Sequence, residues 1–479
     1  MPLYLQMYHG LREAILARHL EPGTRLPSTR ALAHMWQVSR STVVLAFEHL
    51  VAEGYLITRP GSGTFVHAAY PERTTTSAPD VSSHKTVMST PEAKHSSERG
   101  RAVVHHYHAR RKLSDRPLPF RPGVPAEETF PTVLWGRLAG RFWRSVSSAA
   151  LAQQDPFGYL PLRTALADYL RSARGLRVSP EQVLMTTSSQ HALTLIAQLL
   201  TDPGDVVWIE DPGYPRAQAA LQATGARLAP VPVDAQGFDV HRAQQTNAGA
   251  RLAYVTPAHQ YPLGVTMSLQ RRLGLLEWAV QHNGWVVEDD YISEYRYTGR
   301  PLAALQSLDP HGRVLYMGTF SKLFSPTLRL SYVVLPDSLI DLFTASRSLI
   351  DRGPSFGDQA TMTAFMEDGH FSRHIRRMRT LYAERHEALT SALKEAALPQ
   401  LTVTPSQAGT HLVARLSPPL SDAEVTAMLA EAGLMAPALS YFTLTSAPSA
   451  LLLGFSGWPP SVLREGIEQL ALQLGRWSA

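Results

Sequence analysis

Residues 313–335, RVLYMGTFSKLFSPTLRLSYVVL, hold two short apolar runs separated by a polar segment that contains Lys322. Near-continuous apolar runs predict strands that are buried on both faces of a sheet. Four similar runs come earlier in the chain: QVLMTT from 182, DVVWIE from 205, RLAYVTP from 251 and WVVEDDY from 285. Helical stretches separate these runs, and the alternation predicts a doubly wound, mostly parallel α/β sheet. Ligands of such a sheet bind at the carboxyl ends of its strands.

The chain beyond about residue 365 predicts a smaller α+β subdomain. It opens with GHFSRHIRRMRTLYAERHEAL, from Gly369, which has the pattern of one long basic helix. The basic side chains at Arg373, Arg376, Arg377 and Arg379 fit two interpretations, contact with DNA or a helix that faces solvent or a partner subunit. The sequence does not decide between them.

Residues 68–117 predict a flexible linker because they are rich in Ser, Thr and Pro and poor in apolar side chains. This divides the chain into a small domain over 1–67 and a large domain over 118–479. Three histidines in the linker, His105, His106 and His108, suggest a metal site only weakly, since no fourth ligand follows. We therefore expect no metal.

Composition excludes several classes of protein. The chain has no cysteine, so it has no disulfide, thiolate metal site or cysteine nucleophile. It has no run of 18 apolar residues and no export signal at its start, so we expect a cytoplasmic protein without a membrane span. The net charge is +5, and residues 1–67 carry 6 Lys and Arg against 4 Asp and Glu. A positive balance in this part fits a polyanionic partner or a simple solvated surface.

Residues 4–66 predict three helices and a glycine-rich hairpin, the outline of a winged helix-turn-helix. In the third helix, Val43, Phe47 and Leu50 form one apolar stripe. The opposite face near the start of this helix is then free to read base edges and phosphates, with Arg40 as the best reader of guanine. The candidate DNA-binding residues are Ser39, Arg40, Ser41, Thr42 and Val44, and in the hairpin Arg59, Gly61 and Gly63.

Lys322 follows a predicted buried strand, where loss of hydration lowers the pKa of an amine and lets it form a Schiff base with an aldehyde. A structural role is the alternative. Asp289 and Tyr291 end another strand, and they suit a pyridine nitrogen and a phenolate oxygen, as in pyridoxal phosphate. Hydroxyls and an arginine can hold its phosphate, although Ser189 would also serve as a helix cap. Tyr214 can stack on a flat ring or pack in the core, and Arg216 can face an anionic ligand.

The motifs LPSTRALA, VSRSTVVLAFEHLVAEGYL and RPGSGTFV resemble GntR-type bacterial regulators. From about residue 118 the motifs DPFGYLPLR, SSQHAL, EDPGYPR, TPAHQYPLG, EDDYISEYRY and GTFSKLFSPTLRLSY resemble fold type I aminotransferases. The chain as a whole is similar to the MocR subfamily of GntR regulators. The resemblance implies DNA contacts by Arg30 and Arg40, a head-to-tail homodimer, and pyridoxal 5'-phosphate carried on Lys322 as an internal aldimine. The residues that would bind the cofactor are Lys322, Asp289, Tyr291, Tyr214, Ser189, Gln190, Arg329, Ser321 and Tyr261.

Two positions depart from the aminotransferase pattern. Leu452 stands where aminotransferases place the arginine that binds the substrate carboxylate, and Tyr261 stands where they have an asparagine near the ring oxygen. We therefore expect weak or no transamination. Three hypotheses follow: a regulator of vitamin B6 genes that senses pyridoxal phosphate itself, the same regulator with an amino acid or amine as effector bound at Arg216, and an active aminotransferase.

Overall fold

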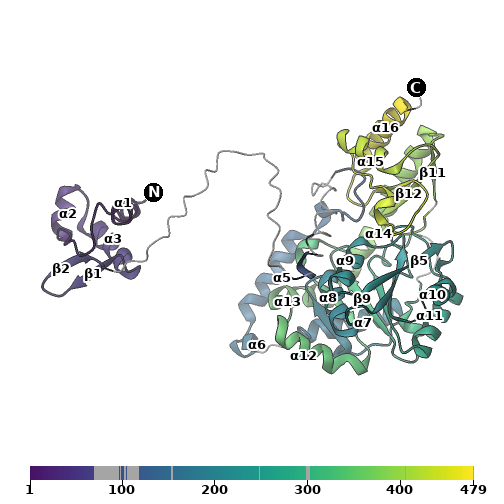
Figure 1. Cartoon of the computed structure of the whole chain (residues 1–479), viewed down its shortest axis with the longest axis horizontal. Coiled ribbons are helices and arrows are strands. Elements are labelled where there is room, and N and C mark those ends of the chain that lie inside the picture. The colour runs from purple at the N-terminus through teal and green to yellow at the C-terminus, as the bar shows by residue number, and fades with distance from the viewer. Residues whose placement is uncertain are drawn as a thin grey trace. The chain divides into compact units, whose positions relative to one another are not determined.

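The computed structural model describes residues 1–68, 97, 99–101, 104, 118–152, 155–247, 249–297, 302–404 and 406–477. The chain divides into two compact units, Met1–Glu92 and Ala93–Ala479 (Figure 1). Most of the predicted linker, including the three histidines, lies outside the described residues, so its exact limits stay predictions. The described residues include no cluster of metal ligands and no helix long and apolar enough to span a membrane.

The N-terminal unit has the predicted winged helix-turn-helix. Its apolar core is formed by side chains from all three helices and the hairpin, among them Ile15, Leu32, Val43, Phe47 and Leu50. The stripe predicted in the third helix is therefore confirmed as buried. The elements are α1 (Leu3–Leu16), α2 (Thr29–Met35), α3 (Arg40–Ala52), β1 (Leu56–Arg59) and β2 (Gly63–Val66).

The C-terminal unit is built on an eight-stranded mixed sheet of order β3-β10-β9-β8-β7-β4-β5-β6. Five neighbouring strands, β9, β8, β7, β4 and β5, are parallel, while β10 is antiparallel to both its neighbours. All six predicted strands are present. The bounds are β3 (Val183–Thr186), β4 (Val206–Asp211), β5 (Arg227–Asp234), β6 (Gly237–Phe238), β7 (Ala250–Val255), β8 (Trp285–Asp290), β9 (Val314–Thr319) and β10 (Ser331–Val334).

Helices cover both faces of the sheet because alternate strand residues are apolar on either side. Along β4, Val207 and Ile209 share an apolar cluster with side chains of α8 and α9. Trp208, which points to the opposite face, shares a cluster with side chains of α10 and α11. This arrangement confirms the doubly wound prediction. The helices are α5 (Thr132–Ser145), α6 (Ser148–Ala152), α7 (Leu160–Arg174), α8 (Ser189–Leu200), α9 (Pro215–Ala223), α10 (Val240–Asn247), α11 (Leu269–Gln281), α12 (Ile340–Ile350) and α13 (Phe356–Glu367).

The last part of the chain forms a smaller three-stranded antiparallel sheet flanked by helices. The predicted long basic helix is α14 (His370–Ala396), whose buried residues join the largest core cluster together with the inner faces of the small sheet. The other elements are β11 (Leu401–Val403), β12 (His411–Leu416), α15 (Asp422–Glu431), β13 (Ala450–Gly454) and α16 (Pro460–Trp477). Figure 1 shows these elements gathered at one end of the unit.

Candidate functional site

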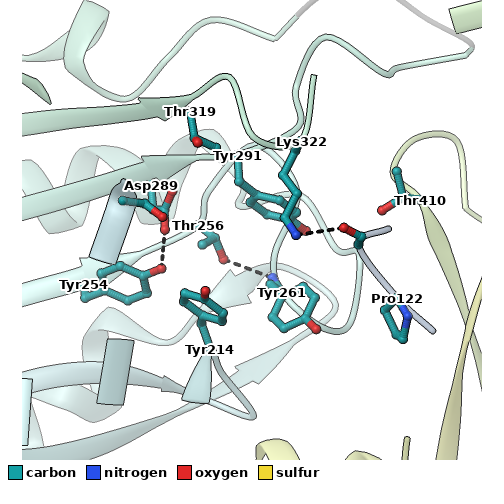
Figure 2. Close-up of a pocket in the computed structure, with 12 residues that line it drawn as sticks. Pro122, Tyr214, Tyr254, Thr256, Tyr261, Asp289, Tyr291, Thr319, Lys322 and Thr410 are labelled. Atoms are coloured by element: carbon teal, nitrogen blue, oxygen red, sulfur yellow. Dashed lines mark hydrogen bonds between the residues drawn. The ribbon is translucent and has the colours of Figure 1, made fainter. Parts of the chain in front are cut away.

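A cavity lies at the carboxyl ends of the parallel strands. This is the edge at which ligands of doubly wound sheets bind. Six of the predicted cofactor residues line it, and Figure 2 shows most of them facing one another. The lining residues are Pro122, Gly123, Ser189, Tyr214, Tyr254, Thr256, Tyr261, Asp289, Tyr291, Thr319, Lys322 and Thr410.

Lys322 enters the cavity from the turn that follows β9. Its Nζ donates a hydrogen bond to the carbonyl oxygen of Gly123, at 2.8 Å (Figure 2). Gly123 has φ +71°, a backbone conformation that favours glycine, and a Cβ there would lie 2.8 Å from the amine, so that the amine would have to shift. Burial lowers the pKa of Lys322 to about 8, and the positive charges of Arg216 and Arg121 contribute to that fall. A substantial part of this amine is therefore neutral and nucleophilic near pH 8.

Asp289 is the buried carboxyl group of the cavity lining. It lies near the end of β8 and accepts a hydrogen bond of 2.5 Å from the hydroxyl of Tyr254 on the neighbouring strand β7. Burial raises the pKa of Asp289 to about 6, although the Tyr254 bond and the Lys322 charge oppose that rise. The carboxyl group thus remains an anion at neutral pH with room for a second, cationic N–H donor.

Tyr291 follows β8 directly and its hydroxyl is buried without a hydrogen-bond partner among the described residues. Its ring lies at 5.8 Å from that of Tyr261, edge to face, and next to the Lys322 side chain in Figure 2. A buried hydroxyl that lacks a partner costs about 1–3 kcal/mol. The site is therefore incomplete without a ligand that bonds this oxygen.

Tyr261 is held by a buried polar network behind the cavity. Its backbone N–H donates to Thr256 Oγ1 at 3.0 Å, and the Thr256 hydroxyl donates to Glu210 at 2.6 Å. The same carboxyl group accepts from Gln260 at 3.1 Å. Burial raises the pKa of Glu210 to about 7 against these bonds. The network fixes the segment that carries the Tyr261 ring over the cavity.

The N-terminus of α8 lies beside the cavity, where unpaired N–H groups can bind an anion. Ser188, rather than Ser189, caps the helix, since its hydroxyl accepts from His191 N at 3.1 Å. The capping alternative for Ser189 is thus wrong, and Ser189 faces the cavity together with Thr319.

Three of the residues predicted to bind the cofactor lie outside the lining. The Gln190 amide donates to Arg216 O at 2.9 Å while its buried Oε1 lacks a partner among the described residues. Ser321 donates its backbone N–H to Thr319 Oγ1 at 3.1 Å. Arg329 is exposed with φ +51°. Their roles toward the cofactor stay predictions.

The cavity opens into a wider mouth on the side of Arg216 and Tyr214. Tyr214 directs its ring edge toward the face of Tyr261, with centroids 5.8 Å apart, and Arg216 is exposed. Arg121, Met435, Tyr441 and Phe442 are among the other residues of the mouth. The mouth therefore combines two guanidinium groups with apolar and aromatic surface.

Leu452 lies in β13 opposite Val413 of β12 and is fully buried. It belongs to an apolar cluster with Leu439 and Phe442, against which Tyr261 packs. The side chain of Leu452, which the resemblance sets at the position of the aminotransferase arginine, is thus surrounded by apolar groups.

The face of α3 predicted to read DNA is exposed. Ser39 caps the helix, with its hydroxyl accepting from Thr42 N at 3.2 Å, and Ser41 Oγ lies 2.8 Å from the same hydroxyl. Arg40 and Ser41 are exposed, while Thr42 and Val44 are half-buried. Arg30 on α2 is also exposed. The cap confirms the predicted start of the helix, and the base contacts stay predictions.

The hairpin tip between β1 and β2 requires its glycines, since Gly61 and Gly63 have φ +77° and +111°. Arg59 is exposed and its guanidinium lies 5.1 Å from the centroid of Phe65. Arg25, which the sequence did not single out, lies against Gly63, where a Cβ would come within 3.1 Å of its Nε. Two arginines thus lie at the hairpin, Arg59 within it and Arg25 in the segment that pairs with Phe65.

Sequence reasoning missed Tyr254, Thr256, Gly123 and Thr410 at the cavity. Tyr254 had one available signal, because it stands near the end of the predicted strand RLAYVTP, at the edge where ligands bind. Gly123 and Thr410 come from segments far from the strands in sequence. Only the folded chain brings them there.

Two family models match the chain. Residues 3–66 match "Bacterial regulatory proteins, gntR family", and residues 145–470 match "Aminotransferase class I and II". Together they cover both compact units.

Curated relatives share this two-part organisation over nearly the full length. The "Probable rhizopine catabolism regulatory protein MocR" of Rhizobium meliloti is 39% identical over 98% of this chain and 93% of its own. The pyridoxine biosynthesis transcriptional regulator PdxR of Corynebacterium glutamicum is 31% identical over 98% and 96%. The transcriptional regulator TauR of Rhodobacter capsulatus is 32% identical over 98% and 96%.

Two solved structures that are similar to this chain are aminotransferases. The kynurenine aminotransferase of Pyrococcus horikoshii has a TM-score of 0.70 at 25% identity, covering 82% of this chain and 97% of its own. The multiple substrate aminotransferase of Thermococcus profundus has a TM-score of 0.69 at 26% identity, covering 80% and 95%.

Proposed function

The chain belongs to the MocR subfamily of GntR-type transcriptional regulators, and on this premise we propose that pyridoxal 5'-phosphate bound at Lys322 is the signal that changes its binding to operator DNA. Genes of vitamin B6 metabolism are the proposed targets. The relative PdxR, which is named for pyridoxine biosynthesis, supports this choice. A head-to-tail homodimer is part of the proposal.

The unpaired, buried hydroxyl of Tyr291 carries the proposal. When bound, pyridoxal phosphate supplies an aldehyde that a neutral amine can attack. Lys322, with its lowered pKa, is the amine in this cavity. Asp289 would accept from the pyridine N–H, Tyr291 would donate to the phenolate oxygen, and Ser189 and Thr319 would face the phosphate. The buried hydroxyl of Tyr291, which has no partner among the described residues, would then have a matching acceptor on the cofactor.

The apolar side chains around Leu452 favour a sensing role for the site over a catalytic one. Leu452 is buried among apolar side chains, so no guanidinium stands where a substrate α-carboxylate would be held in an aminotransferase. The curated relatives named above are transcriptional regulators by name. Weak transaminase activity remains compatible with the fold and is a second outcome of the spectroscopic test below.

The mouth of the cavity favours one alternative, an amino acid or amine effector that meets bound cofactor. Arg216 and Arg121 offer positive charge there, and Tyr441 and Phe442 offer apolar surface. Because Leu452 replaces the usual arginine, an effector whose anionic group is distant from its amine fits this mouth better than an ordinary α-amino acid.

The deciding experiment is a DNA-binding titration of the cofactor-free chain. We expect pyridoxal phosphate alone to change operator affinity. A change that requires a second amine or amino acid would select the alternative effector, and conversion of the cofactor from aldehyde to amine, followed by absorbance, would indicate an aminotransferase. An affinity that no addition alters would contradict the proposal. The Arg40→Ala chain serves as the control for specific binding.

A further inference from the structure

Two helices of the C-terminal unit, α5 and α14, carry exposed arginines that the proposed function does not use, and six of these lie on α5 and on the first two turns of α14. On α5 they are spaced by four and three residues, which places them on one face of the helix. On α14 they occupy the first two turns. We call these residues the basic surface: Arg137, Arg141, Arg144, Arg373, Arg376 and Arg377.

Hydrogen bonds bring the two sets of arginines together. Arg141 forms an ion pair of 2.9 Å with Asp368, and Arg373 donates to the carbonyl oxygen of the same residue at 3.0 Å. Arg377 donates to the carbonyl oxygen of Thr129, just before α5, at 2.8 Å. Figure 1 shows α5 beside α13, the helix that leads into α14. The basic surface is therefore continuous across both helices.

The positive charge of this surface is largely uncompensated. Residues 117–479 contain 30 Lys and Arg against 31 Asp and Glu, so the unit as a whole is close to neutral. Elsewhere in the described part of this unit, arginines such as Arg163, Arg174 and Arg271 are paired with carboxylates. On the basic surface Arg141 has the one ion pair that the described residues show.

Two of the guanidinium groups are also held in place. The bonds of Arg373 and Arg377 go to neutral carbonyl oxygens, so they orient the side chains without cancelling their charge. Arg144 folds back over Gly140, where an added Cβ would lie 3.1 Å from its Nη1. A row of oriented arginines matches a repeating anion, because guanidinium groups bind phosphates with paired donors.

We propose that the basic surface binds the phosphate backbone of DNA, as a second contact beyond the one made by the N-terminal unit. The inference rests on DNA binding by this regulator, which supplies a polyanion as the natural partner. Phosphate contacts of this kind position a protein and strengthen binding without reading sequence. A second copy of the chain is the competing occupant, and the test separates the two.

The test compares two triple variants of the full chain that remove equal charge. Arg137→Ala/Arg144→Ala/Arg376→Ala removes three of the five arginines of the basic surface that form no ion pair among the described residues, and it leaves the hydrogen bonds of Arg373 and Arg377 in place. Arg242→Ala/Arg251→Ala/Arg464→Ala is the matched control, three exposed arginines elsewhere on the same unit. The probe is an operator duplex selected by the full chain from a random library, both alone and extended by about two helical turns on each side.

We expect the basic-surface variant to bind the extended duplex roughly tenfold or more weakly than the parent. The log–log slope of its salt dependence should fall by about 0.9 for each phosphate that the variant no longer neutralises. The control variant should bind like the parent. Equal affinity of parent and basic-surface variant, or an equally weakened control, would overturn the inference.

Two further measurements separate this surface from other contacts. A changed sedimentation coefficient of the basic-surface variant, without a change in DNA affinity, would assign the surface to contact between copies of the chain and overturn the inference. Arg40→Ala keeps the basic surface and so tests the N-terminal contact separately. If both the Arg40→Ala chain and the parent fail to select any duplex, the regulator function itself fails, which is distinct from a failure of the basic surface.

Discussion

The amine of Lys322 has a pKa of about 8 because it is buried near Arg216 and Arg121. Only the neutral amine attacks an aldehyde, so the rate of cofactor attachment should rise as pH increases through 8 and level off above it. A solvated lysine, with a pKa near 10.4, would keep gaining rate well beyond that point. Stopped-flow absorbance after mixing the cofactor-free chain with pyridoxal phosphate measures this profile.

Replacing the lysine tests the same assignment directly. Lys322→Ala should remove the visible absorbance of the covalently bound cofactor while circular dichroism stays unchanged, since the side chain makes one hydrogen bond, to Gly123. Lys394→Ala, at an exposed position near the end of α14, is the matched control and should retain the band. A persistent band in Lys322→Ala would contradict the assignment of this lysine.

Removal of the hydroxyl group by a Tyr→Phe substitution should have different effects at Tyr291 and at Tyr254. Tyr291→Phe removes a buried hydroxyl without a partner, so the cofactor-free chain should be as stable as before or more so, while pyridoxal phosphate binds about tenfold more weakly. Tyr254→Phe removes the donor to Asp289 and should destabilise the cofactor-free chain by about 1–3 kcal/mol. Denaturant unfolding and cofactor titration of both variants separate a ligand-binding from a structural hydroxyl. Equal behaviour of the two variants would refute the distinction.

At the scale of the element, two adjacent residues at the start of α3 are expected to contribute to different properties. Substituting Ser39 should change the stability of the unit, and substituting Arg40 should change its affinity for DNA. Ser39 caps the helix, so Ser39→Ala should lower the stability of the N-terminal unit by about 1 kcal/mol. Arg40 is exposed at the first helical turn, and Arg40→Ala should leave stability unchanged but weaken operator binding by about 1–3 kcal/mol. Thermal unfolding and DNA titration of both variants check the division. Operator affinity unaffected by Arg40→Ala would remove this residue from the reading face.

The strands also show which secondary structure the sequence pattern can predict. Apolar runs predicted six strands correctly, but β5 was missed because Pro230 and Pro232 break the usual strand composition. Pro230 and Pro232 are two residues apart, so the positions at which each lacks an N–H face the same side of β5. On that side β5 pairs with the two-residue β6 over only two residues, so the prolines cost few hydrogen bonds of the sheet. The antiparallel direction of β10 was likewise out of reach, since strand direction depends on pairing partners rather than on local pattern.

The sequence predicts those residues of the site that stand in a recognisable motif at the end of a predicted strand. Asp289, Tyr291 and Lys322 each follow a recognisable apolar run, so the topology alone brings them to one edge. Gly123 and Thr410 reach the cavity from the segment before α5 and from the small sheet, and no local pattern indicates their neighbours. The same limit applies to the basic surface, because the hydrogen bonds that join α14 to the residues around α5 exist only in the folded unit.

For the whole molecule, a regulator requires that its two units be coupled in free energy. If pyridoxal phosphate changes operator affinity by some factor, bound operator must change the affinity for pyridoxal phosphate by the same factor. We expect a factor between about 5 and 150, the usual range of such couplings. Cofactor titrations of the chain with and without saturating operator duplex, set against DNA titrations with and without cofactor, give the two factors independently.

The same four titrations distinguish a chain that senses pyridoxal phosphate from a chain that binds it without any effect on DNA affinity. Saturation at about 100 times the dissociation constant should stabilise the C-terminal unit by about 2.7 kcal/mol in either case, because any ligand of the folded state does so. Only a sensor transmits part of this energy to α3. With Lys322→Ala both factors should fall to one, whereas Arg40→Ala should weaken operator binding yet leave the cofactor's effect on it intact. Two equal factors of one in the parent chain would exclude pyridoxal phosphate as the effector, even if it binds tightly.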